Sequence, residues 1–110
     1  LDPFTRRELL KLLKEINEQG KTVIIVTHDM DVVSEMAKRV IVIDGNQIVY
    51  DDSKDKLFRD EDLVNKHHLD IPSTIKILKS VKEELGLDVD IYKYNLEDTY
   101  KEIKRVLENE

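Results

Sequence analysis

The sequence predicts an α/β fold in which a small core of helices and strands is followed by a mostly helical region. Two apolar runs, at 23–26 and 40–43, have the continuous hydrophobicity of strands that are buried on both faces of a parallel sheet. Amphipathic stretches at helical spacing lie around these runs, and the composition becomes polar and helical from Asp51 onward. We therefore expect a core over residues 1–52 and a helical accessory region over residues 53–110.

Composition and charge narrow the class of protein. The chain has 110 residues, enough for one compact domain, and 38% of them are charged residues of both signs mixed along the sequence. The net charge of −6 and the absence of a basic stripe make a nucleic acid an unfavourable partner. The lack of cysteine excludes disulfides and thiolate metal sites and fits a reducing cytoplasm. No apolar run approaches the roughly 18 residues that cross a bilayer, so any membrane role must go through a partner.

The first helix should begin at Pro3, with Asp2 accepting hydrogen bonds from its free N–H groups. Leucines and Ile16 recur at helical spacing up to about Gln19, where Gly20 offers a left-handed stop. Since the chain opens directly on this helix cap, without an initiator methionine, we expect a fragment or a processed product.

The rest of the core should alternate between helix and strand. A short helix is expected over 29–37, the second buried strand over 40–43, and an alternating strand over 47–50. The turn Asp44-Gly45-Asn46 should join the two strands as a hairpin.

The accessory region should contain four helices and one short strand. Ser53 should cap a helix over 54–59, and Asn95 the last helix; the others are expected over 61–66 and from Pro72-Ser73 to Gly86, with an edge strand over 88–92. The last helix carries an apolar stripe of Leu96, Tyr100, Ile103 and Leu107.

Gly20-Lys21-Thr22 looks like the end of a phosphate-binding loop but lacks its context. Such a loop follows the pattern G-x-x-x-x-G-K-[ST] between a strand and a helix, whereas here Glu15 occupies the first glycine position and the order is helix, then strand. We interpret the motif as a helix stop followed by a solvated lysine.

His28 is a candidate functional residue because it follows the first predicted strand. In open parallel sheets, ligands gather at the carboxyl ends of the strands, where His28 should lie. The alternative is a histidine that caps a helix or packs in the core, and spacing alone does not decide between the two.

Three motifs together resemble a known family. The order is Leu1-Asp2-Pro3 before an amphipathic helix, then Gly20-Lys21-Thr22-Val23-Ile24-Ile25-Val26-Thr27-His28-Asp29, then the hairpin from Val40 to Val49. This arrangement resembles the carboxyl-terminal portion of ABC transporter ATP-binding subunits. The resemblance implies a partial P-loop NTPase core with parallel strands and a hairpin.

The same resemblance implies roles for four residues. Leu1, Asp2 and Pro3 would be the D-loop, which lies at the interface with a second ATPase subunit. His28 would be the switch histidine, which contacts the γ-phosphate of ATP and the attacking water. ATP and Mg²⁺ would be cofactors of the complete ATPase. No metal ligand and no further ATP ligand is expected in this chain.

The accessory region is similar to that of energy-coupling factor ATPases and related cobalt or nickel importers, through Lys56-Leu57-Phe58, Leu69-Asp70-Ile71-Pro72 and the Asn95-Leu96-Glu97-Asp98 helix start. This implies uptake of a vitamin or a transition-metal ion, with an identical or related ATPase subunit and transmembrane subunits as partners at the cytoplasmic face of the membrane. The 110 residues lack the phosphate-binding lysine, the Mg²⁺ ligands and the general base, so alone they should not hydrolyse ATP.

The residues also allow two other functions to be compared with this one. A dimerisation or regulatory module would use the exposed face of the last helix, with Ile103 and Leu107 beside Tyr100. A receiver-like domain is disfavoured because no acidic cluster follows the first strand.

Several polar and aromatic clusters have simpler structural explanations than a site. His67 and His68 point about 100° apart on a helix and do not suggest a metal site. The acidic clusters at 51–52 and 60–62 lack calcium-loop spacing and are interpreted as helix caps. The tyrosines near the end should pack the accessory region.

Overall fold

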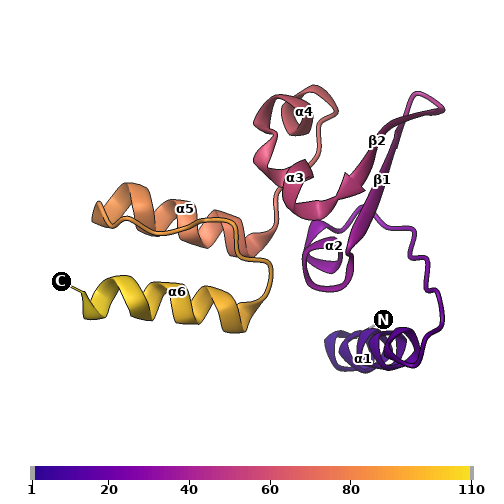
Figure 1. Cartoon of the computed structure of the whole chain (residues 1–110), viewed down its shortest axis with the longest axis horizontal. Coiled ribbons are helices and arrows are strands. Elements are labelled where there is room, and N and C mark those ends of the chain that lie inside the picture. The colour runs from indigo at the N-terminus through magenta and orange to yellow at the C-terminus, as the bar shows by residue number, and fades with distance from the viewer. Residues whose placement is uncertain (1, 110) are drawn as a thin grey trace.

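The computed structural model describes residues 2–109, and Figure 1 shows an elongated arrangement with the hairpin toward one end and the last two helices at the other. The elements in chain order are α1 (Pro3–Glu18), α2 (Met30–Met36), β1 (Arg39–Asp44), β2 (Gln47–Ser53), α3 (Lys54–Arg59), α4 (Glu61–Lys66), α5 (Ser73–Leu85) and α6 (Leu96–Glu108).

Helix α1 forms as predicted but contributes no side chain to a hydrophobic core within the described residues. Asp2 caps it, accepting hydrogen bonds from the Thr5 backbone N–H at 2.9 Å and the Thr5 hydroxyl at 2.8 Å. Gly20, with φ of +94°, follows its end. No side chain of α1 is buried, and Phe4 is 68% exposed. In Figure 1, α1 lies apart from the other helices, and Leu9 and Leu12 of its apolar stripe are 44% and 51% exposed.

The prediction of a buried strand at 23–26 is wrong for this structure. The segment lies outside any helix or strand, and Ile24 and Val26 are 86% and 97% exposed. A strand requires a neighbour that completes its hydrogen-bond ladder, and among residues 2–109 the only sheet consists of β1 and β2. The apolar run has strand-forming residues without a sheet to join.

The hairpin forms at the predicted place, but not as part of a parallel sheet. Strands β1 and β2 pair antiparallel, and Gly45 and Asn46 both have positive φ, as a two-residue turn of this kind requires. Val40 and Val42 pack against the main core, whereas Ile41 and Ile43 are 48% and 70% exposed. One face of the hairpin is thus covered and the other is open.

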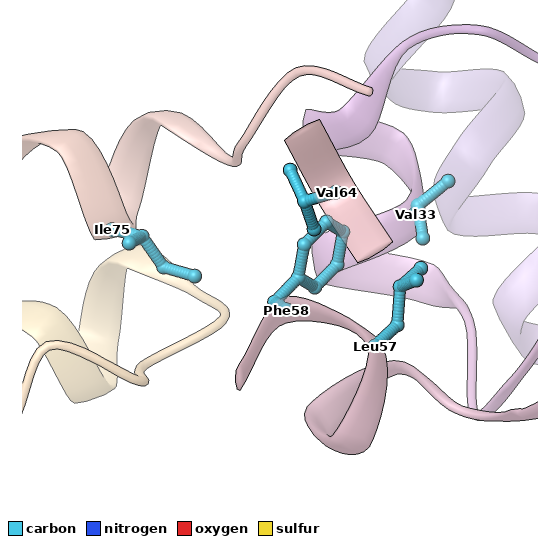
Figure 2. Close-up of a cluster of buried hydrophobic side chains, with 5 residues drawn as sticks. All are labelled: Val33, Leu57, Phe58, Val64 and Ile75. Atoms are coloured by element: carbon cyan, nitrogen blue, oxygen red, sulfur yellow. The ribbon is translucent and has the colours of Figure 1, made fainter. Parts of the chain in front are cut away.

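The main core joins the hairpin region to the accessory region. Its buried members come from α2, α3, α4 and α5, and Figure 2 shows them as sticks: Val33, Leu57, Phe58, Val64 and Ile75. Because α2 contributes to the same cluster as α5, the segment after His28 and the accessory region share one core.

The segment between α5 and α6 contains no edge strand, contrary to the prediction for 88–92. Its backbone groups bond to side chains of neighbouring helices instead of to a second strand. Glu102 accepts the Asp90 N–H at 2.6 Å, and the Thr74 hydroxyl donates to the Lys93 carbonyl at 2.7 Å. Val89, only 3% exposed, anchors the segment in a second small core with Leu78 and Val106.

Helix α6 is capped by Asn95, whose side chain accepts the Asp98 N–H at 2.8 Å, as predicted. Of the predicted apolar stripe, only Ile103 packs against the second core, and the stripe as a whole does not form the buried face of α6. Thr99, Glu102 and Val106 are buried, while Leu96 and Tyr100 are 75% and 65% exposed. The buried face contains polar residues because their side chains bond to the adjacent backbone, as Glu102 does.

The Glu102 carboxylate should make the chain sensitive to acid. Its side chain is 7% exposed, and the hydrogen bond with Arg105 lowers its pKa from 4.5 to about 2. Because the folded pKa is depressed, the stabilisation is complete above about pH 4.5 and is lost as pH falls toward 2. We expect Glu102→Gln to lower the free energy of unfolding near pH 7 by about 1–2 kcal/mol, allowing for the half-exposed Arg105.

Urea unfolding measured at several pH values checks this. The stability of the native chain should fall more steeply below pH 4.5 than that of Glu102→Gln. Glu97→Gln, which removes an exposed carboxylate from the same helix, is the control and should leave the pH profile unchanged. Equal pH profiles for Glu102→Gln and the native chain would contradict the assignment.

Candidate functional site

His28 lies at the end of the unpaired 23–26 segment and two residues before α2. Its side chain is exposed and lines a pocket of about 240 Å³, which also includes residues from the start of α2 and from the start of α5. The lining residues are His28, Asp29, Met30, Asp31, Asp70, Ile71 and Ser73. The imidazole is therefore accessible to a ligand from solvent.

Asp29 fixes the backbone immediately after His28. It caps α2, accepting the Asp31 N–H at 2.9 Å, and its own N–H donates to the Thr27 hydroxyl at 3.0 Å. Its carboxylate also pairs with Arg6, and this hydrogen bond lowers its pKa. Asp29 thus connects the histidine segment to the first turns of α1.

The predicted D-loop residues lie at the start of α1. Leu1 is outside the described residues. Asp2 is exposed, and its bond to the Thr5 backbone N–H lowers its pKa, so the carboxylate is charged at neutral pH. Pro3 is the first helical residue and is exposed. The Arg6–Asp29 pair, one turn further along α1, brings this end of the helix to the histidine segment.

A contact that the sequence did not suggest joins the same segment to the accessory region. The Asp31 carboxylate accepts both the Ser73 backbone N–H at 2.7 Å and the Ser73 hydroxyl at 2.8 Å. The two residues are far apart in the sequence, and neither has a neighbour pattern that marks a site. The Asp29 cap, by contrast, could be inferred from an acidic residue directly before an amphipathic stretch.

His67 contacts the hairpin beside its turn and so has a structural explanation. Its Nδ1 lies 2.8 Å from the Asp44 carboxylate, and this hydrogen bond lowers the pKa of Asp44. His68 follows with φ of +55°. Within residues 2–109, no group of three or more histidine, cysteine, aspartate or glutamate side chains could hold a metal ion.

Within the described residues, the exposed imidazole of His28 is the main group that could contact the phosphates of ATP. A histidine in this position can donate a hydrogen bond to a phosphate oxygen, but phosphoryl transfer also needs cations on the phosphates and a base for water. Lys21 of the Gly-Lys-Thr motif is exposed after the stop of α1, with no helix beginning beside it. None of the helices formed by residues 2–109 is long and apolar enough to cross a membrane.

The curated proteins that are similar to this chain include several of one kind. No protein-family model matches the chain. It is 33% identical over 110 residues to the energy-coupling factor transporter ATP-binding protein EcfA3 of Oenococcus oeni, covering 100% of this chain and 38% of that protein. With EcfA of Methanothermobacter thermautotrophicus it shares 32% identity over 107 residues, 97% of this chain and 34% of that protein.

A third relative, EcfA1 of Caldanaerobacter subterraneus, is 37% identical over 90 residues, 81% of this chain and 32% of that protein. The chain spans about a third of the length of these curated relatives. Similarity along the entire chain confirms the resemblance that the Thr27-His28-Asp29 motif and the hairpin indicated. The chain belongs to the ABC transporter ATP-binding proteins and corresponds to a carboxyl-terminal portion of those that serve energy-coupling factor transporters.

Proposed function

We propose that this chain acts as the carboxyl-terminal part of the ATP-binding subunit of an energy-coupling factor importer, with His28 as the residue that contacts the γ-phosphate. The observation that carries the proposal is the unpaired apolar run at 23–26, which leads directly to an exposed histidine. Inserted between neighbouring parallel strands, this run would be buried and would place His28 at the ligand-binding edge of the sheet.

The exposed apolar surfaces support this placement. The stripe of α1, the 23–26 run and the outer face of the hairpin are all uncovered, with Ile43 70% exposed and Ile48 66% exposed. Patches of this kind mark surfaces that another part of a protein covers. We propose that the strands and helices of a complete ATP-binding core cover them.

Cofactors and partners follow from the same proposal. The complete subunit would bind ATP and Mg²⁺ and pair with a second ATPase subunit, with Asp2 and Pro3 in the D-loop at that interface. Transmembrane subunits would hold the pair at the cytoplasmic face of the membrane. The transported solute would be a vitamin or a transition-metal ion such as cobalt, and residues 53–110 would form the accessory region.

A chimera tests the proposal. In it, this chain replaces the matching segment of the Oenococcus oeni relative, which aligns with all 110 residues. We expect the chimera to hydrolyse ATP at a rate within about tenfold of that relative, because the rest of the relative would supply the groups that this chain lacks and His28 would complete the site. The 110-residue chain alone should show no hydrolysis above background, since it lacks the groups that bind Mg²⁺ and activate water.

A chimera that folds and binds ATP but does not hydrolyse it would contradict the proposal. If, in addition, sedimentation showed that the chain alone self-associates, the alternative dimerisation module would be favoured. The exposed stripe of Leu96, Tyr100 and Leu107 on α6 would then be its contact surface.

A further inference from the structure

The orientation of His28 depends on few contacts. Residues 21–27, which precede it, lie outside any helix or strand and are mostly exposed. Helix α2, which follows it, is by contrast attached to the rest of the chain by its buried Val33 and Ser34. Within this chain, α2 and the Arg6–Asp29 pair are therefore the contacts that hold the histidine segment in place.

The first turn of α2 is attached to the first turn of α5 by a two-point contact. Both Asp31 carboxylate oxygens accept from Ser73, one from its N–H at 2.7 Å and one from its hydroxyl at 2.8 Å. The residue at the cap of α5 is Pro72, which has no side-chain hydrogen bond to offer. Asp31 thus supplies from another element the acceptor that a helix start needs.

Two further contacts attach α2 to the accessory region, both through the buried Ser34. The Ser34 hydroxyl, in a residue 2% exposed, donates to the Tyr94 carbonyl at 2.7 Å. The Lys54 ammonium donates to the Ser34 carbonyl at 2.5 Å and lies 5.2 Å from the centre of the Tyr94 ring. A shift of the accessory region would therefore move α2 as a body.

His28, Asp31 and Ser73 all line the same pocket. A displacement of the start of α5 would act directly on the Asp31 carboxylate, which is three residues from His28. The Asp31–Ser73 contact is therefore a direct polar link between the accessory region and the segment that carries the histidine, beside the apolar packing of Met30 on the main core.

We propose that Asp31 and Ser73 are positioning residues for His28, through which the accessory region controls the placement of the switch histidine. The inference rests on the proposed function for its catalytic consequence, but its structural part concerns this chain alone. A partner that binds the accessory region and shifts α5 would thereby alter the productive geometry of His28, without touching the nucleotide.

The structural part is tested on the 110-residue chain by amide hydrogen exchange and by NMR of the His28 ring. Ser73→Ala removes the hydroxyl donor. Asp31→Asn removes the negative charge and replaces one of the two acceptor oxygens with an NH2 group. We expect the amides of residues 31–33 to exchange at least threefold faster and the His28 ring signals to shift. Ser73→Thr retains the hydroxyl and should restore native values.

Asp51→Asn is the matched control, because Asp51 makes an equally short two-point contact with Arg39 on the hairpin, at 2.7 Å for both bonds. It should leave the His28 ring signals unchanged. Unaltered His28 signals and exchange rates in Ser73→Ala and Asp31→Asn would overturn the inference whether or not the chain serves an ATPase.

The catalytic part is tested in the active chimera. Ser73→Ala and Asp31→Asn should each lower kcat about three- to tenfold with little change in KM for ATP, and the double variant should be no slower than the slower single one. Retention of full kcat by both variants in a chimera that His28→Ala inactivates would overturn it. A chimera inactive with native residues would instead contradict the proposed function and leave the exchange and NMR result to decide the coupling.

Discussion

Replacing His28 with alanine should reduce ATP hydrolysis by the chimera about a hundredfold or more. A donor aimed at the charge that develops on the transferring phosphoryl group contributes on the order of a hundred- to a thousandfold in rate. The exposed imidazole makes few contacts of its own, so its removal should leave the fold intact. Steady-state hydrolysis assays would give kcat, and nucleotide titration would show ATP binding reduced far less than turnover.

His68→Asn is the control for this substitution. It removes another exposed imidazole, and asparagine tolerates the positive φ of 55° at that position. This variant should hydrolyse ATP at the native rate. If the His28→Ala chimera kept its activity, the switch-histidine role would be wrong, although the family membership would stand.

Leu57→Ala should lower the free energy of unfolding by about 2–5 kcal/mol, the usual cost of emptying a buried leucine site. Leu57 is 0% exposed and packs in the core that α2, α3, α4 and α5 share. A domain of this size is stable by only about 5–15 kcal/mol, so this loss is a large part of the total. Urea unfolding followed by circular dichroism measures it as a fall in the midpoint at an unchanged slope.

Leu96→Ala makes the same chemical change at a position that is 75% exposed. Its effect should stay within about 0.5 kcal/mol, as for most surface substitutions. A loss below about 1 kcal/mol for Leu57→Ala would show that the core joining the hairpin region to the accessory region is not formed.

Local signals in the sequence predicted most of the helices. Asp2, Ser53 and Asn95 each accept the backbone N–H that their cap positions require, and Gly86, with φ of +63°, ends α5. These features depend on a few adjacent residues, because a cap or a left-handed stop is a local backbone interaction. The hairpin turn was equally predictable from the sequence, since Gly45 and Asn46 both tolerate the positive φ that the turn needs.

The strands were harder to predict because pairing is not a local property. The 23–26 run and the 88–92 segment have suitable residues, but whether a segment becomes a strand depends on a neighbour that can complete its ladder. Within the described residues the first has none, and in the second the Asp90 backbone N–H bonds to the Glu102 side chain.

By itself, the sequence determined the helix boundaries, the hairpin turn, the family to which the chain belongs and His28 as the residue to test. Each of these follows from short motifs whose meaning does not depend on distant residues. Only the tertiary structure decided that α6 turns Tyr100 outward and that Ser73 bonds to Asp31, because both depend on which surfaces meet when segments far apart in the chain pack together. Hydrogen bonds between such segments leave no periodic signal in the sequence, so the contact between the accessory region and the histidine segment could be found only in the fold.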